Sequence, residues 1–222
     1  MSSPGKRPGK VDKAMAQRYV DEALVQIDRA GGLHGLNLRQ VSRTLGCAHT
    51  NTYNYFDSLP DLLWQAVAAA LERQIQYSLR PQERVGGREA AFEHFIGTQV
   101  DFALEHPGWY RAIWLEALEG PTPEPVLPLL ARAGEVLLEQ LSLVSPVTLS
   151  LAQSLEVADL FHTYLHGALC KAIAGRVQSN DPAAIRRDII LKARRVLRML
   201  VDEPQSQTKG ERKPRSLRSP AR

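Results

Sequence analysis

Polar side chains follow one another between residues 49 and 54 of this 222-residue chain, and five of them are candidates for hydrogen bonds with a partner. They are His49, Thr50, Asn51, Tyr53 and Asn54. Such side chains hydrogen-bond with base edges in a groove of DNA or with phosphate oxygens, and an asparagine amide matches the donor and acceptor that adenine presents. The chemistry that this stretch indicates is therefore recognition of DNA, with Asn51 and Asn54 as candidate readers of adenine.

A helix-turn-helix would position this polar stretch, and residues 37–56 carry the pattern of one. Asn37 is a suitable N-cap, and Gln40 follows three residues later to complete a capping box. One apolar face of the first helix consists of Leu38, Val41 and Leu45. Gly46 can adopt the positive φ that ends a helix. We expect the second helix to span about 48–55.

The flanking sequence predicts further helices on both sides of this motif. Upstream, an apolar stripe at helical spacing consists of Ala16, Val20, Ala23, Leu24, Ile27 and Ala30, and Gly31-Gly32 ends that helix. Downstream, Ser58 and Asp61 resemble a capping box ahead of a long apolar helix. Residues 13–79 therefore indicate a helix, a short helix, a turn, a second short helix and a long helix.

This arrangement resembles the TetR family of transcriptional repressors. The resemblance is carried by Gly31, Leu38, Val41, Leu45, Gly46, the run Tyr53-Asn54-Tyr55-Phe56, and Leu62-Leu63. It implies an N-terminal three-helix DNA-binding domain and a C-terminal helical domain. In the family, the second domain holds an effector pocket and forms a homodimer through its last two long helices. By the same resemblance, Tyr53 is a candidate phosphate contact, whereas we expect Tyr55 and Phe56 to pack in the core.

Four residues depart from the pattern of the family. Ala48 stands in place of the usual serine cap of the second helix, and losing a cap costs about 1 kcal/mol. Ser42 and Thr52 replace a common alanine and a usual leucine. Leu59 occupies a position where many members carry a lysine that touches phosphate. We expect these departures to change the affinity for DNA and the docking of the second helix, but not the fold.

The net charge of +4 is unevenly distributed along the chain. Residues 1–13 carry +3 and residues 205–222 carry +5, so residues 14–204 carry −4. Lys and Arg supply most of the non-specific affinity for DNA, and the second helix of the motif contains neither. The candidate phosphate or minor-groove contacts are Lys6, Arg7, Lys10 and Lys13 in an N-terminal arm, and Arg39 in the first helix, with Arg43 nearby.

The N-terminal residues are charged and lack the apolar region that a secretory signal would have. Residues 204–222 are polar, basic and contain proline, which is typical of disordered segments. This tail can act as a solubilising segment or as an extra sequence-independent DNA contact. Because no secretory signal and no sufficiently long apolar run is present, we expect a cytoplasmic protein without membrane contact. In that compartment Cys47 and Cys170 should not form a disulfide.

The second half of the sequence predicts helices near 88–105, 124–143, 147–175 and 182–201, and a short aromatic helix after a break at 106–108. The helix at 147–175 is apolar on two sides. One side contains Leu151, Leu155, Ala158, Leu165, Leu169 and Ile173, and the other contains Val157, Leu160, Phe161, Tyr164 and Ala168. Because both sides must be covered, we expect one in the core and one against a second copy of the chain.

Aromatic and imidazole side chains on these helices are candidates for an effector pocket. They are Phe92, Phe95, Phe102, Trp109, Tyr110, Trp114, Phe161, His162, Tyr164 and His166. Such a lining suits an apolar or amphipathic small molecule, while the alternative is that most of these residues fill the core. The i, i+4 spacing of His162 and His166 can bind zinc, but no further ligands are evident. We therefore expect no metal and no cofactor.

The sequence contains no phosphate-binding loop, dinucleotide motif, nucleophile elbow or HExxH motif, so we expect no enzyme. We predict an all-α chain of about nine helices. Its predicted parts are a basic flexible arm (1–12), a helix-turn-helix DNA-binding domain (13–57), a helical effector-binding and dimerisation domain (58–203) and a basic disordered tail (204–222).

The predicted function is that of a ligand-responsive homodimeric repressor that binds a palindromic operator in double-stranded DNA. One alternative is a helical small-molecule-binding or interaction protein with a weakened DNA-binding head. Another is an activator, or a non-specific DNA binder that relies on its basic tails.

Overall fold

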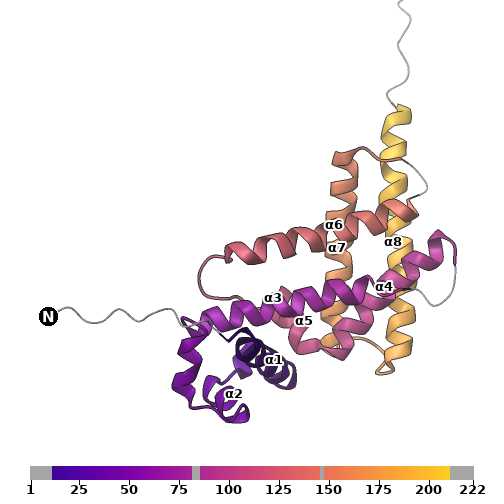
Figure 1. Ribbon diagram of the computed structural model, residues 1–222. Helices are drawn as coiled ribbons and strands as arrows, with labels where there is room; N and C mark the ends of the chain where they lie inside the picture. Colours follow the sequence, from indigo (N-terminus) through magenta and orange to yellow (C-terminus); the bar gives the residue numbers. More distant parts are fainter. Residues whose placement is uncertain (1–11, 82–85, 146–147, 211–222) are drawn as a thin grey trace, which may run out of the picture. The chain divides into compact units, whose positions relative to one another are not determined.

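The computed structural model describes residues 12–81, 86–145 and 148–210, with side chains described as far as residue 202. These residues form eight α-helices and three 3₁₀-helices and contain no strand (Figure 1). The predicted all-α fold is therefore confirmed. Within the described ranges, the nine helices expected from the sequence correspond to the eight α-helices and the six-residue 3₁₀-helix η2. The other two 3₁₀-helices are three residues long. Within those ranges, no helix is long and apolar enough to cross a membrane.

The chain divides into two compact units. Unit 1 comprises Met1–Glu83 and Thr98–Val136, and unit 2 comprises Arg84–Gly97 and Leu137–Arg222. Helices α4 (Arg88–Glu105) and α6 (Leu127–Val144) contribute residues to both units. The domain boundary expected between residues 57 and 58 stays a prediction.

Unit 1 begins with the helices expected around the helix-turn-helix motif. They are α1 (Lys13–Ala30), η1 (Leu33–Gly35), α2 (Leu38–Thr44), η2 (His49–Asn54) and α3 (Leu59–Ser78). Asp12 caps α1 through its side chain, and Gly31 ends the helix at a φ of 74°, which glycine adopts readily. The later part of unit 1 adds α5 (Pro107–Trp114) and η3 (Glu124–Val126).

One hydrophobic cluster holds these elements together. Leu24 and Ile27 of α1, Val41 of α2 and Leu62 of α3 are almost fully buried in it. Burial of each such side chain stabilises the fold by about 1.5–3 kcal/mol. The apolar stripe predicted for α1 is therefore the face on which the later helices pack.

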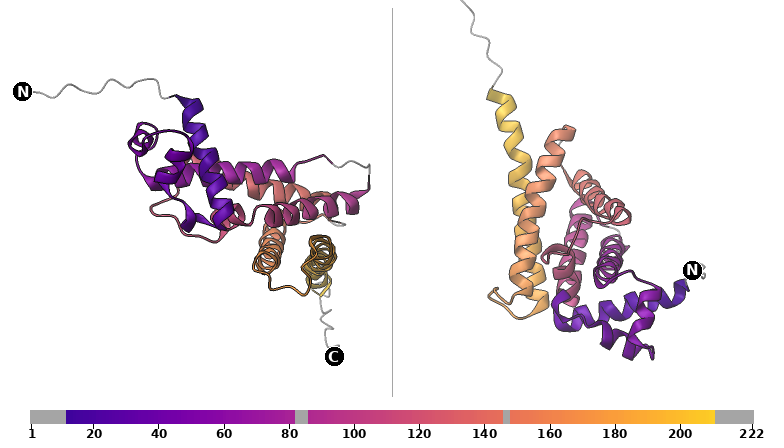
Figure 2. Two further views of the ribbon diagram at one scale, coloured as in Figure 1. Left: turned by 90° about the horizontal axis from the view of Figure 1, so that it is seen from below. Right: turned by 90° about the vertical axis from the view of Figure 1, so that its left-hand side faces the viewer.

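Unit 2 is centred on two long helices, α7 (Leu151–Ile173) and α8 (Pro182–Gly210), which lie side by side (Figures 1 and 2). A full capping box formed by Ser150 and Gln153 begins α7. Phe161 of α7 and Ala193 of α8 have no exposed surface. The two helices thus share a packed apolar core.

Two boundaries in the second half differ from the predictions. Helix α5 includes Pro107 and Gly108, because proline is tolerated in the first turn of a helix. Helix α8 continues to Gly210, beyond the expected end near residue 201 and into the segment predicted to be a disordered tail. The remaining tail residues, 211–222, lie outside the described residues.

Helix α7 buries one face within unit 2. The buried residues are Val157, Ala158, Phe161, Leu165, Leu169 and Ala172. Ala172 belongs to neither side named in the sequence analysis, and the other five come from both sides. The exposed leucines are Leu151, Leu155 and Leu160, with 74%, 50% and 47% of their surface accessible. A single chain therefore leaves apolar side chains of α7 on its surface, and their cover by a second copy stays a prediction.

Candidate nucleic-acid interface

A helix cap, a glycine with positive φ and a backbone hydrogen bond shape the turn between α2 and η2. Asn37 caps α2 by accepting hydrogen bonds from two N–H groups of its first turn. Gly46 has a φ of 70°, and the N–H of Cys47 donates to the carbonyl of Ser42 at 2.9 Å. Ala48 provides no side-chain cap for η2. The second helix of the motif is thus a short 3₁₀-helix at the predicted place.

Two residues that depart from the family pattern form a buried pair. Ser42 Oγ lies 2.9 Å from Thr52 Oγ1, and both residues are at most 1% exposed. The Ser42 hydroxyl also donates to the carbonyl of Leu38 at 3.0 Å. Because a serine hydroxyl has one proton, Ser42 accepts the other bond and Thr52 donates it. The two departures therefore compensate each other, and a satisfied hydrogen bond joins α2 to η2.

The outer face of η2 consists of the side chains predicted to contact DNA. His49, Thr50, Tyr53 and Asn54 are exposed, and Asn51 is half-buried. Asn54 Nδ2 donates to Asn51 Oδ1 at 2.8 Å, which orients both amides. Among the described residues, the Asn51 amide nitrogen and the Asn54 side-chain carbonyl oxygen make no further hydrogen bond, so they can serve as a donor and an acceptor for base edges.

Aromatic rings behind η2 hold this face on α1. Phe56 is 2% exposed, and Tyr55 packs against the same hydrophobic cluster. The ring centroids of Tyr55 and Phe56 lie 5.6 and 6.0 Å from that of Tyr19. These are the usual distances of interacting aromatic pairs, so the core role expected for both residues is confirmed.

Three of the basic side chains on α1 and α2 that could contact phosphates are exposed. Lys13 is the first residue of α1, and Arg39 and Arg43 lie on α2. The other predicted contacts of the arm, Lys6, Arg7 and Lys10, lie outside the described residues. The first residue of α3 is Leu59, which is partly exposed where many TetR proteins carry lysine.

Polar contacts join the second half of α1 to α5, and sequence analysis did not anticipate them. The indole N–H of Trp109 donates to an α1 carbonyl at 2.8 Å. The Asp28 carboxylate accepts a bond from the N–H of Gly108 and lies 2.8 Å from His106 Nδ1. A Cβ atom on Gly108 would overlap the carbonyl oxygen of Ile27. The two helix backbones are therefore in direct contact at a segment whose only sequence signal was a helix break.

Solved structures share this arrangement of helices. A TetR-family transcriptional regulator from Streptomyces coelicolor is 16% identical, and the match covers 89% of this chain and 86% of that chain with a TM-score of 0.69. This chain has the TetR fold. A second TetR regulator from the same organism is 18% identical, with 84% of this chain and 97% of that chain covered and a TM-score of 0.62.

A TetR variant from Acinetobacter baumannii, solved in complex with minocycline, is 14% identical to this chain. The match covers 85% of this chain and 95% of that chain, with a TM-score of 0.55. The sequence itself matches no protein-family model and no curated protein. The likeness that the motif indicated locally therefore extends, in fold, over most of the chain.

The aromatic residues predicted to bind an effector fall in both units of this TetR fold. Phe102, Trp109, Tyr110 and Trp114 belong to unit 1, where Phe102 and Tyr110 are buried. Trp114 Nε1 donates to Gln74 Oε1 at 2.9 Å. Because both indole groups of α5 make hydrogen bonds inside unit 1, their position has a structural explanation.

The remaining predicted effector residues lie in unit 2 of the TetR fold. They are Phe92, Phe95, Phe161, His162, Tyr164 and His166. The ring centroids of Phe92 and Phe161 are 5.7 Å apart. The buried Tyr164 hydroxyl has no hydrogen-bond partner within the described ranges, and burial raises the pKa of this phenol. Binding of an effector by these residues stays a prediction.

The histidine pair of α7 lies in a partly desolvated site. Burial lowers the pKa of His162 and of His166 below the ordinary value of 6.5, and the neighbouring His166 lowers that of His162 further. Cys170 Sγ lies 3.5 Å from His166 Nε2. In the part of the chain that the structure describes, no three His, Cys, Asp or Glu side chains are placed to hold a metal.

Proposed function

We propose that this chain is a DNA-binding transcriptional regulator that reads DNA with η2. The observation that carries the proposal is the exposed polar face of η2, backed by the buried pair Ser42–Thr52 and by Phe56. A rigid short helix with such a face can enter the major groove. There Asn51 can contact a base edge and Tyr53 a phosphate.

Basic residues beside η2 supply the phosphate contacts that η2 lacks. Lys13 and Arg39 are exposed in the structure, and the proposal adds Lys6, Arg7 and Lys10 of the N-terminal arm. Neutralisation of phosphates by these residues makes the affinity fall steeply with salt. Binding through this face should therefore combine sequence preference with a strong salt dependence.

The regulator acts as a homodimer in this proposal. A single η2 reads few base pairs, whereas two copies related by a two-fold axis read a palindrome in successive major grooves. The exposed apolar side chains Leu155 of α7 and Leu191 and Met199 of α8 offer surface for such a contact. An effector that binds one spacing of the two heads more tightly would release the operator, which makes the protein a ligand-responsive repressor.

Selection of bound sequences from random DNA by the full-length chain tests the proposal. We expect a palindrome, and operator affinity should fall by about tenfold or more in Asn51→Ala and in Tyr53→Ala. Gln76→Ala changes an exposed residue of α3 outside the polar face and serves as the matched control. Unchanged affinity of both η2 variants would exclude η2 as the reading element.

A second candidate function is a helical ligand-binding protein whose DNA-binding head has weakened. The missing cap at Ala48 and the absence of Lys and Arg from η2 favour it. In that case the selection yields no consensus sequence. A chain lacking residues 1–11 and 211–222 separates a third case, because a binder that relies on its tails loses all affinity on their removal.

A further inference from the structure

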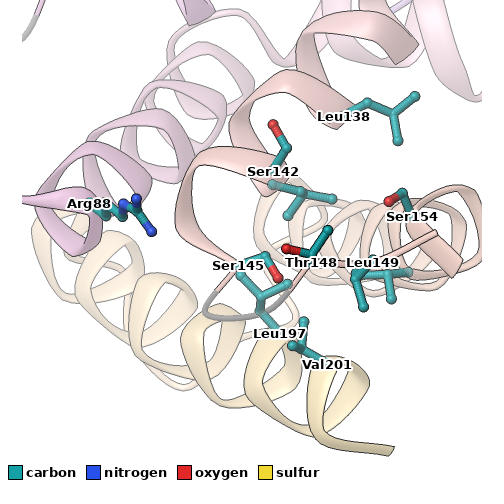
Figure 3. Close-up of a pocket in the computed structure, with 11 residues that line it drawn as sticks. Arg88, Leu138, Ser142, Ser145, Thr148, Leu149, Ser154, Leu197 and Val201 are labelled. Atoms are coloured by element: carbon teal, nitrogen blue, oxygen red, sulfur yellow. The ribbon is translucent and has the colours of Figure 1, made fainter. Parts of the chain in front are cut away.

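Unit 2 contains a pocket of about 360 Å³, and none of the aromatic residues considered above is among its lining residues (Figure 3). Its walls come from α4, α6, α7, α8 and the connection between α6 and α7. The apolar lining consists of Leu138, Leu141, Leu149, Val157, Leu197 and Val201. This volume lies within the range of small-molecule sites in proteins.

The polar lining contains a single charged side chain, Arg88 of α4. Its guanidinium lies on one side of the pocket, and the Ser154 hydroxyl lies on the opposite side (Figure 3). Among the described residues, no hydrogen bond or ion pair engages the Arg88 side chain. Ser142 and Thr148 add further hydroxyl groups between these two points.

The acidic residues that follow Arg88 on α4 already have partners. Glu89 pairs with Arg198 at 3.0 Å, and Glu93 pairs with Arg194 at 2.7 Å. These pairs connect α4 to α8 and leave Arg88 as the cation of the pocket. A guanidinium without a protein carboxylate is suited to a carboxylate from a ligand, because the two groups match in a bidentate geometry.

We propose that this pocket binds an amphipathic aliphatic monocarboxylate, with the carboxylate on Arg88 and the hydrocarbon body against the leucines and valines. One cation balances one negative charge, whereas a phosphate dianion would need a second cation. The hydroxyls of Thr148 and Ser154 can bind an oxygen carried further along the body. The inference rests on the proposed regulator, because it names the chemical class of the effector. It assigns the effector to the lining of this pocket in place of the aromatic residues expected from the sequence.

Calorimetric titration of the full-length chain with decanoate and with decan-1-ol tests this site. The wild-type chain should bind decanoate about tenfold or more tightly than the alcohol, because only the carboxylate forms a charge-assisted pair with Arg88. Arg88→Gln should remove this difference. Arg187→Gln removes an exposed α8 arginine outside the pocket and should leave binding unchanged. Equal decanoate affinity in Arg88→Gln and the wild type overturns the proposal.

A second variant tests the cavity itself. Ser154→Phe places a ring in the pocket from α7 and should abolish binding of decanoate while the helical circular dichroism stays the same. If Ser154→Phe is folded and binds decanoate with wild-type affinity, the ligand occupies another place and the proposal is wrong. Arg88→Gln, a change at an exposed position, keeps the test decisive if Ser154→Phe does not fold.

The calorimetry is independent of DNA, so the two proposals fail in different ways. A chain that selects a palindrome but does not bind decanoate overturns the monocarboxylate site and leaves the regulator. A chain that binds decanoate through Arg88 but selects no DNA sequence supports the site and overturns the regulator.

Discussion

The helix contacts of unit 1 and the pocket of unit 2 differ in how their polar groups are satisfied. In unit 1 the buried hydroxyls of Ser42 and Thr52 bond to each other, and Trp109 donates to α1. In unit 2 the pocket presents Arg88 without a partner in the described ranges, and Leu155 of α7 is half exposed. These contacts of unit 1 are thus satisfied by its own residues, whereas the pocket and the exposed face of α7 in unit 2 are surfaces that a ligand or a second chain would cover.

Removal of a large core side chain from each unit should have the largest effect on stability and on binding. Phe56 and Phe161 are both almost fully buried, so Phe56→Ala and Phe161→Ala should each lower the free energy of unfolding by about 3–5 kcal/mol. Phe56→Ala should abolish operator binding at 37 °C and preserve decanoate binding. Phe161→Ala should abolish decanoate binding and also weaken operator binding, because the proposed dimer contact lies on α7 and α8. Denaturant unfolding and the two binding assays measure this. Equal loss of both activities in both variants would contradict separate roles for the units.

The Ser42–Thr52 pair offers a sharper test of the hydrogen bond between α2 and η2 in unit 1. Ser42→Ala leaves the buried Thr52 hydroxyl without an acceptor and should destabilise the fold by about 1–3 kcal/mol. Thr52→Val should cost less, because Ser42 still donates to the carbonyl of Leu38. In a double-mutant cycle with urea unfolding, the double variant should be more stable than the sum of the single effects predicts. Additive effects would mean that the hydroxyls do not interact.

A charge on the exposed face of α7 should reveal whether a second chain completes unit 2. Leu155→Glu should weaken dimerisation by about tenfold or more, or ~1.4 kcal/mol, because burial of an unpaired carboxylate is unfavourable. The melting temperature of the single chain should change little, since half of this side chain is exposed. Leu115→Glu, at a leucine of unit 1 that is 45% exposed, is the matched control. Sedimentation equilibrium that gives the same dimer constant for both variants would place the interface elsewhere.

The smallest expected effect is a pH dependence of unit 2. The folded-state pKa values of His162 and His166 lie below 6.5, so the unfolded chain binds protons more readily than the folded chain. Stability is therefore retained above the unfolded pKa and falls as the pH decreases through 6.5 towards the folded values. Melting curves between pH 7.5 and 5.5 should show this loss, and it should be smaller in a His162→Gln, His166→Gln variant, where the opposing charge of Asp159 remains. The same slope in that variant would assign the effect to other groups.

The sequence predicted unit 1 well because its signals are local. The cap at Asn37, the positive φ of Gly46 and the buried Phe56 each depend on residues close by in the chain. The pairing of Ser42 with Thr52 was not predicted, because each was considered as a separate departure from the family pattern. Their compensation depends on the angle between two helices, which the spacing of residues does not specify.

The sequence predicted the helices of unit 2 but not which surfaces they form. The lining of the pocket comes from four helices and a connection, and its residues share no periodicity. Aromatic residues were expected to line an effector site, yet Trp109 and Trp114 direct their indole N–H groups to partners inside unit 1. The hydrogen-bond partner of an indole N–H depends on which helices pack against it, so residue type alone could not assign these roles.

The contact of Gly108 with α1 limits how this molecule can evolve and move. Because any side chain at this position would occupy the space of the Ile27 carbonyl oxygen, every substitution must push α5 away from α1. In a saturation library scored for operator binding, position 108 should therefore tolerate fewer residues than an exposed position of α3 such as Gln76. For the same reason we expect a tilt of α1 to be accompanied by a tilt of α5, because their backbones are in direct contact at Gly108.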